Sequence, residues 1–164
     1  MTGPTVAQDV IEALVAQRRT IAVAESLTGG LLVAELVSVP GASAVVLGGV
    51  VAYSTELKHS LLGVPAALLA AHGPVHPSVA AEMAERVRAL LAVGGTPASI
   101  GIGTTGVAGP GAQDGHPAGT VFVGLSTDAG TRVLALRLDG DRAVIRHAVV
   151  SESLLELKRI LLPE

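Results

Sequence analysis

The stretch Ala24–Gly30, with the sequence Ala-Glu-Ser-Leu-Thr-Gly-Gly, joins two segments of different periodicity. Residues 20–24 are a short apolar run with β-branched side chains, which predicts a buried strand, and residues 31–37 predict a helix. A strand, a turn and a helix in this order place a small hydroxyl at the carboxyl end of the strand, beside backbone N–H groups that favour negative charge. Ser26 is therefore a candidate nucleophile.

This turn has two interpretations. If Ser26 reacts, Thr28 caps the helix while Gly29 and Gly30 allow a ligand close to the backbone, so we expect all three residues to bind substrate. In the alternative, Ser26 and Thr28 do no more than cap the helix. The turn alone does not decide between these interpretations.

The rest of the chain alternates between apolar runs and amphipathic segments, without an internal repeat or a linker. The pattern predicts strands at 20–24, 44–53, 98–103, 120–127 and 131–138, and helices at 5–18, 31–37, 54–62, 65–71, 78–92 and 141–162. We therefore expect an α/β fold, a three-layer α/β/α sandwich with a mixed, mostly parallel sheet.

The run 44–53 is apolar without alternation, which is typical of a central strand covered on both faces. It also contains Gly48-Gly49, an unusual pair inside a strand. Two adjacent glycines indicate a bulge or a place where another group approaches the backbone closely. Gly49 is for this reason a further candidate contact with substrate.

Length and charge exclude several classes of partner. The chain has 164 residues, which fits one domain over 1–164, and a formal net charge of −3 with one Tyr, one Phe and no Trp. Such a surface offers nucleic acid neither a basic patch nor a stacking platform. The sequence has no signal peptide and no apolar run of roughly 20 residues, so we expect a cytoplasmic protein that does not contact membranes.

Metal-binding and redox chemistry find little support in the side chains. The absence of cysteine excludes disulfides, thiolate metal sites and a cysteine nucleophile. Among five histidines only His72 and His76 have the spacing of ligands on one helix face, and Pro74 between them breaks a helix. The sequence thus predicts no metal site.

A Gly-rich segment follows the strand expected at 98–103. Gly101–Gly106 matches the dinucleotide pattern G-x-G-x-x-G, but the Pro- and Gly-rich residues 107–119 cannot begin the helix that holds a pyrophosphate. We therefore interpret the segment as a ligand-binding loop at the end of a strand. Thr105 and Gly106 are its candidate contacts with substrate.

Lysine usage indicates a base. The chain has nine arginines but only Lys58 and Lys158, and Lys58 lies shortly after Tyr53, at the end of an expected strand. Burial lowers the pKa of a lysine far enough for it to act as a base, which arginine cannot do. We expect Ser26 as nucleophile, Lys58 as its base and Tyr53 as a phenol that relays or orients the proton. The alternative is a solvated lysine on a helix surface.

Two arginines open the last expected helix. Arg142 follows Gly140-Asp141, and Arg146 lies one helical turn later on the same face. Together with the positive end of the helix, they are suited to grip a phosphate. Surface ion pairs with carboxylates are the alternative.

Three motifs follow one another along the chain, Ala24-Glu-Ser-Leu-Thr-Gly-Gly30, Tyr53-Ser-Thr-Glu-Leu-Lys58 and Thr105-Gly-Val-Ala-Gly-Pro110. Together they resemble the CinA C-terminal domain family, which in bacteria includes nicotinamide mononucleotide amidases. The resemblance extends over nearly the whole chain and includes Gly140-Asp-Arg142. It implies an α/β/α sandwich that associates into homo-oligomers.

The resemblance also implies an activity. The amidases of this family hydrolyse the carboxamide of a small nucleotide, nicotinamide mononucleotide, to nicotinic acid mononucleotide and ammonia in pyridine-nucleotide salvage, without a cofactor. The positions that match the family motifs are Ser26 as nucleophile, Lys58 as the motif lysine, Tyr53 ahead of it, Thr105 and Gly106 in the substrate loop, and Arg142.

Two positions depart from the family pattern. Leu27 stands where the family commonly has Cys, and Thr55 where it commonly has Asn. Neither departure removes a proposed catalytic group, so both bear on substrate preference. Two other functions stay open, a nucleotide-binding or regulatory module without turnover, and a protein-interaction domain linked to competence or DNA damage.

Overall fold

A computed structural model describes residues 4–163 of the chain. Within them, five strands form one sheet in the order β2-β1-β3-β4-β5. The strands β2, β1 and β3 are parallel to one another, and only β4 runs against its two neighbours. The sheet is therefore mixed, with four of its strands pointing the same way. The strand bounds are β1 Ile21–Glu25, β2 Val46–Val51, β3 Ile100–Gly106, β4 Thr120–Thr127 and β5 Gly130–Arg137.

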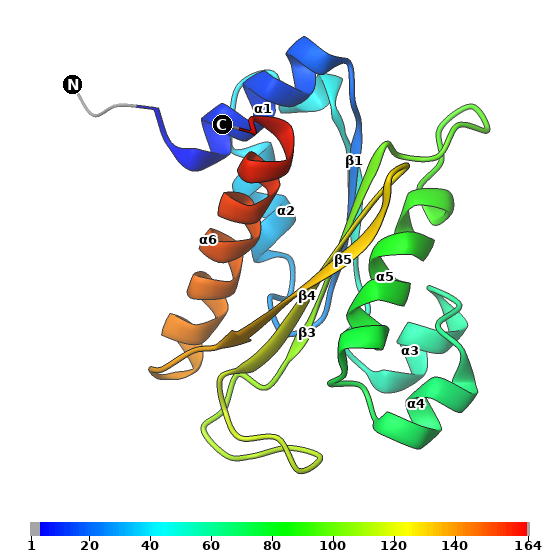
Figure 1. Cartoon of the computed structure of the whole chain (residues 1–164), viewed down its shortest axis with the longest axis vertical. Coiled ribbons are helices and arrows are strands. Elements are labelled where there is room, and N and C mark those ends of the chain that lie inside the picture. Colours follow the sequence, from blue (N-terminus) through cyan, green and yellow to red (C-terminus); the bar gives the residue numbers. More distant parts are fainter. Residues whose placement is uncertain (1–3, 164) are drawn as a thin grey trace.

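Helices cover both faces of the sheet, which confirms the α/β/α sandwich (Figure 1). On one face lie α1 (Val6–Gln17), α2 (Leu31–Val37) and α6 (Arg142–Leu161), and on the other α3 (Thr55–Ser60), α4 (Ala66–His72) and α5 (Pro77–Leu90). Each interface has its own cluster of buried apolar side chains. No helix in this part of the chain has the length and apolar character needed to cross a lipid bilayer.

The expectation of a central strand at 44–53 was wrong, because β2 lies at the edge of the sheet. Its residues are half-buried or exposed, and Val51 retains 44% of its surface, whereas all five residues of β1 are buried. The apolar composition of a strand does not show how many neighbouring strands it pairs with. The expected bulge is present, as a shift in register between β1 and β2 beside Gly48.

Glycines in β3 and β4 bring α5 directly onto the sheet. A Cβ atom on Gly103 would lie 2.6 Å from the carbonyl oxygen of Ala80 and 2.7 Å from the amide nitrogen of Ala84. Added Cβ atoms on Gly101 and Gly124 would also come closer than 3.0 Å to the backbone of α5. Two of the three glycines that imitate a dinucleotide motif, Gly101 and Gly103, therefore serve helix packing, whereas Gly106 packs against β4.

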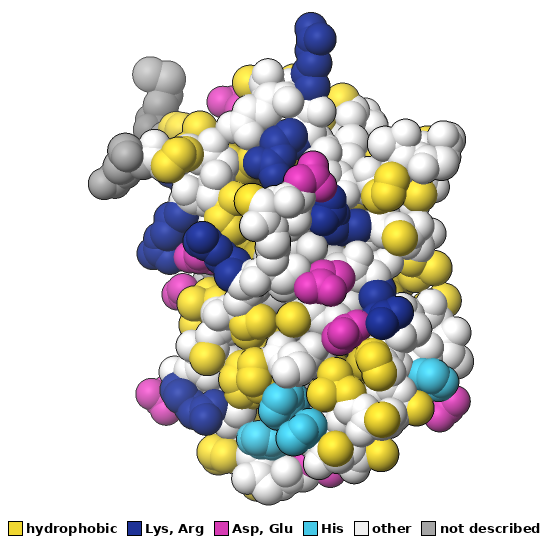
Figure 2. All heavy atoms as spheres, turned by 45° about the vertical axis from the view of Figure 1, so that its right-hand side comes forward, with side chains coloured by type: hydrophobic (Ala, Val, Ile, Leu, Met, Phe, Trp, Pro, Cys, Tyr) yellow, Lys and Arg dark blue, Asp and Glu magenta, His cyan; other side chains and the backbone are white. Residues whose placement is uncertain are grey.

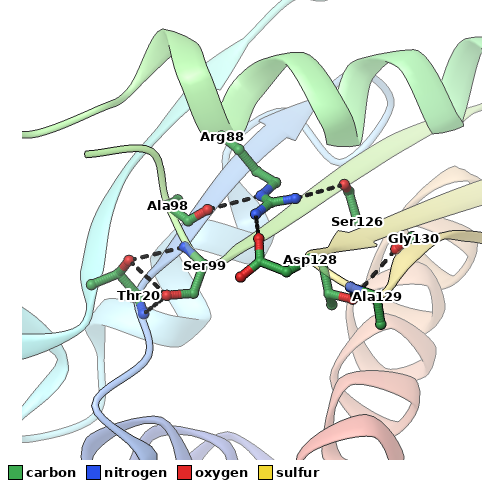
Figure 3. A network of polar contacts seen from close by, with 9 residues as sticks. Thr20, Arg88, Ala98, Ser99, Ser126, Asp128, Ala129 and Gly130 are labelled. Carbon is green, nitrogen blue, oxygen red and sulfur yellow. Dashed lines mark hydrogen bonds and ion pairs between the residues drawn. The ribbon is translucent and has the colours of Figure 1, made fainter. Parts of the chain in front are cut away.

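A polar network closes the amino end of the sheet (Figure 3). Arg88, near the end of α5, donates from Nε to the carbonyl of Ala98 (2.8 Å), from Nη1 to Oγ of Ser126 (3.4 Å), and forms an ion pair with Asp128. Beside it, the side chain of Ser99 and the side chain of Thr20 each accept a hydrogen bond from the other's backbone N–H, both at 3.1 Å. These contacts join the starts of β1 and β3 to the hairpin between β4 and β5, at the end of the sheet opposite the turn that follows β1.

Candidate active site

Ser26 lies in the turn that follows β1, with 7% of its surface exposed. Its backbone N–H donates to the carbonyl of Thr104 in β3 at 3.1 Å, which continues the pairing of the two parallel strands by one residue. The Thr28 hydroxyl bonds to the Thr104 hydroxyl at 2.9 Å. The turn is thus attached to the central strand of the sheet.

Glu25 occupies the N–H groups at the start of α2. Its buried carboxylate accepts hydrogen bonds from the backbone of Gly30 (3.0 Å), Leu32 (3.1 Å) and Val33 (2.9 Å). The cap of this helix is therefore a glutamate from the preceding strand, and the expectation that Thr28 caps it was wrong, because Gly30 is the N-cap and has no side-chain bond.

Lys58 contacts the candidate nucleophile. It lies in α3 with 1% of its surface exposed, and its Nζ is 2.9 Å from Oγ of Ser26, 2.9 Å from the carbonyl of Ala52 and 3.2 Å from the carbonyl of Tyr53. The short helix is positioned by Ser54, whose hydroxyl accepts from the N–H of Leu57 at 3.2 Å. The structure thus joins Ser26 and Lys58, which are 32 residues apart in sequence.

Burial lowers the pKa of Lys58 from 10.5 to about 8. A neutral lysine carries two N–H hydrogens and one lone pair. The carbonyls of Ala52 and Tyr53 accept the two hydrogens, which leaves the lone pair to accept the proton of the Ser26 hydroxyl. This arrangement suits a general base for a serine nucleophile.

Both residues open onto a cavity of about 300 Å³ at the carboxyl end of the sheet. Six of the residues predicted from the sequence line it: Ser26, Tyr53, Lys58, Thr105, Gly106 and Arg142. The other four do not line it. Thr28, Gly29 and Gly30 lie behind Ser26 in the turn, and a Cβ on Gly49 would meet Cβ of Val33 in α2 at 3.0 Å, so the close approach at Gly49 is to a helix.

Arg142 links two other residues that line the cavity. Its Nη2 donates to the Tyr53 hydroxyl and its Nη1 to the carbonyl of Gly109, both at 2.9 Å. Tyr53 is 59% exposed, so its ring is open to a ligand. Within residues 4–163 neither Arg142 nor Arg146 forms an ion pair, which removes that alternative for this part of the chain.

Thr105 faces the cavity as an acceptor. Its buried hydroxyl donates to the carbonyl of Pro74 at 2.7 Å, so the oxygen keeps only lone pairs for a ligand. Pro74 and Val75, ahead of α5, and residues of the loop 107–113 also line the cavity, as do Leu27 and Thr55, the two positions that depart from the family pattern.

Residues 4–161 match the CinA C-terminal domain family. The chain belongs to this family. It is 51% identical over 143 residues to the CinA-like protein of Frankia casuarinae, a match that spans 87% of this chain and 32% of that protein. The chain therefore spans about a third of the length of such relatives.

Solved structures of CinA superfamily proteins have the same fold. One from Klebsiella pneumoniae has a TM-score of 0.89 and 32% identity, over 95% of each chain. One from Escherichia coli has a TM-score of 0.87 and 28% identity, over 94% of this chain and 88% of that one. The names of these relatives give the family and state no reaction.

The sequence missed the role of Glu25, and the shared phosphate site expected for Arg142 and Arg146 is not what the structure shows for Arg146. Glu25 caps α2, and Arg146 reaches the turn from α6, where its Nε donates to the carbonyl of Leu27 (2.8 Å) and its Nη2 to that of Thr28 (3.1 Å). The available signal for Glu25 was a carboxylate in an otherwise apolar strand. For Arg146 the helical spacing from Arg142 suggested a shared ligand, whereas the two guanidinium groups have different partners.

Several histidine side chains lie close together on the surface of the domain. Figure 2 shows them near the lower edge of the face that includes α4 and α5. The rings of His72 and His76 stack with centroids 4.3 Å apart, and burial, followed by the charges of His72 and His116, lowers the pKa of His76. Within residues 4–163, no three acidic or histidine side chains are arranged to hold a metal ion.

Proposed function

We propose that this CinA domain is an amidohydrolase that converts nicotinamide mononucleotide and water to nicotinic acid mononucleotide and ammonia. The observation that carries the proposal is the 2.9 Å contact between Nζ of Lys58 and Oγ of Ser26 at the wall of a cavity. A buried lysine with a pKa near 8 beside a serine hydroxyl is an arrangement for acyl transfer. The family resemblance supplies the substrate.

In the first half of the reaction Lys58 accepts the proton of Ser26, and Oγ attacks the carboxamide carbon. The tetrahedral intermediate collapses as the C–N bond breaks, and Lys58 returns the proton to the nitrogen, which leaves as ammonia. An acyl ester on Ser26 remains. Water, deprotonated by Lys58, then attacks this ester, the C–O bond to Ser26 breaks, and Lys58 returns the proton to Oγ, which gives the acid and the free serine.

The oxyanion needs donors that the protein has not already used. Glu25 has taken the N–H groups of Gly30, Leu32 and Val33, so the start of α2 cannot supply them. The backbone N–H groups of Leu27 and Thr28 have no acceptor within residues 4–163 and directly follow the nucleophile. Of these two residues Leu27 lines the cavity, so we assign the oxyanion to the N–H group of Leu27.

The nucleotide phosphate is assigned to Arg142. This guanidinium is held by two neutral acceptors, a phenol and a carbonyl, which a phosphate can displace through stronger charge-assisted bonds. Arg142→Met is expected to raise KM for nicotinamide mononucleotide by about 10-fold or more, in line with the loss of one bond to a charged group. With nicotinamide riboside, which lacks the phosphate, the same variant is expected to match the wild type, and an equal loss with both substrates would contradict the assignment.

Ammonia release by the purified wild type tests the proposal directly. We expect nicotinamide mononucleotide to yield ammonia and nicotinic acid mononucleotide in equal amounts, measured by a coupled assay and by mass spectrometry. Binding of the nucleotide without ammonia release would instead favour the regulatory module.

The pH profile tests the role of Lys58. Only the neutral amine accepts a proton, and because burial lowers its pKa to about 8, kcat/KM is expected to rise about tenfold per pH unit below 8 and to level off above it. A series of initial rates between pH 6.5 and 9.5 covers this range. A profile that is flat from pH 6.5 to 8 would exclude Lys58 as the base.

A further inference from the structure

The turn that carries Ser26 lies outside the regular structure of the sheet and of α2. It contains Gly29 and Gly30, both with positive φ (58° and 102°), so its own sequence leaves the backbone unusually free. The reaction proposed above nevertheless requires Ser26 to stay at hydrogen-bond distance from Lys58. The bonds of Ser26 and Thr28 to Thr104 hold the turn from the side of the sheet, and a second set of contacts holds it from the opposite side.

Arg146, which lies in α6, holds the turn that carries Ser26. Its guanidinium binds two successive carbonyls of the turn, those of Leu27 at 2.8 Å and Thr28 at 3.1 Å. A Cβ on Gly29 would lie 3.2 Å from Nη2 of Arg146, so the glycine gives the guanidinium room to lie against the backbone. The side-chain hydrogen bonds of this partly buried arginine therefore go to backbone carbonyls of the turn.

Glu25 holds the following residues of the same segment. It binds the N–H groups of Gly30, Leu32 and Val33, while Arg146 binds the carbonyls just before them. The two charged side chains thus fix complementary backbone groups on either side of Gly29. Fixing two adjacent carbonyls also orients their peptide planes, because each peptide unit is planar.

We propose that Arg146 is a positioning residue that holds Ser26 in line with Lys58. This inference rests on Ser26 being the nucleophile of the proposed function, but it does not depend on the identity of the substrate. Arg146 touches neither the cavity nor the reacting atoms, and it acts through the backbone of Leu27 and Thr28. Arg142, one helical turn away, contacts the cavity instead.

The reactivity of Ser26 toward a fluorophosphonate probe tests this role without a natural substrate. In that reaction Oγ forms a bond to phosphorus, fluoride leaves, and the proton of the hydroxyl passes to Lys58. The rate constant, followed by intact mass, is expected to fall about 100-fold in Arg146→Ala, the effect of a displacement near 1 Å at the reacting atoms. Arg146→Lys, which keeps the charge and can reach one carbonyl, is expected to lie between the alanine variant and the wild type.

Chemical rescue separates positioning from a general effect on the fold. Millimolar guanidinium is expected to restore part of the labelling rate of Arg146→Ala, while sodium at equal ionic strength does not. The pH midpoint of labelling should stay that of the wild type, because Lys58 is unchanged. Arg159→Ala is the matched control, since it removes an exposed arginine of the same helix that is paired with Glu156, and it should label at the wild-type rate.

The outcomes distinguish this inference from the proposed function. If Arg146→Ala melts at a lower temperature but labels at the wild-type rate, the arginine only stabilises the fold and the inference is overturned. If wild-type Ser26 is labelled and the variant is slow, but no ammonia is released from nicotinamide mononucleotide, the inference stands and the proposed substrate is wrong. A wild type that the probe does not label at Ser26 overturns both.

Discussion

Lys58→Met is expected to lower kcat for ammonia release about a thousandfold or more, which is the range of a general base that also returns the proton to the leaving group. The thioether accepts no proton and cannot activate Ser26. Lys58→Arg is expected to lose as much, although it keeps the positive charge, because a guanidinium stays protonated. Retained activity in the arginine variant would show that the charge of Lys58, and not its basicity, is what the site uses.

Ser26→Ala is expected to lose a similar factor, and the double variant little more than either single one, because nucleophile and base act as a unit. Nucleotide binding should persist in all of these variants and can be followed by calorimetry. Two independent losses that multiply in the double variant would contradict the dyad.

Stability measurements show whether Lys58→Met loses activity only because its fold is less stable. The folded-state pKa of Lys58 lies below its unfolded value, so the charged lysine costs the folded state free energy below pH 8, and this cost disappears as the pH rises from 8 toward 10.5. The wild type should therefore gain stability relative to Lys58→Met over that window. The melting temperatures of both proteins between pH 7 and 10 measure the difference.

Gly101→Ala is expected to destabilise the fold by about 3 kcal/mol, at the upper end of the usual cost of overpacking. The added Cβ would collide with the carbonyl of Ala84 in α5, a backbone atom that moves only if the helix moves. Urea unfolding followed by circular dichroism measures the loss.

Gly111→Ala is the matched control for this substitution. Its added Cβ meets nothing within 4 Å, and its φ lies outside the left-handed region, so the free energy of unfolding should stay within about 0.5 kcal/mol of the wild type. If Gly101→Ala were as stable as this control, α5 would not need a glycine at position 101 in order to pack on the sheet.

The strand–turn–helix at residues 20–37 could be predicted because its signals are local: a β-branched run, a hydroxyl, two glycines and a helical segment. The pairing of Ser26 with Lys58 rested on a rare residue type at the end of an apolar strand, and the structure joins the two. The edge position of β2 was missed because neighbours in a sheet are set by crossovers between distant segments, which the composition of one strand does not contain.

The sequence also did not predict which charged side chains bind backbone groups. Glu25 and Arg146 act on N–H and carbonyl groups, which every residue carries, so no spacing between side chains identifies them. The helical pair Arg142 and Arg146 shows the same limit. Equal spacing predicts a shared face, but the backbone that each guanidinium meets decides its role.

The Arg88 network ties down the end of the sheet where β1 and β3 begin (Figure 3). Ser26 and Lys58 lie beyond the other end, where β1 stops. Free-energy changes at sites without shared partners add. Heat resistance gained by substitutions around Arg88 should therefore combine with altered substrate preference at the cavity, without the trade-off that arises when one set of residues carries both properties. Laboratory evolution of this domain can treat the two ends of its sheet as separate libraries.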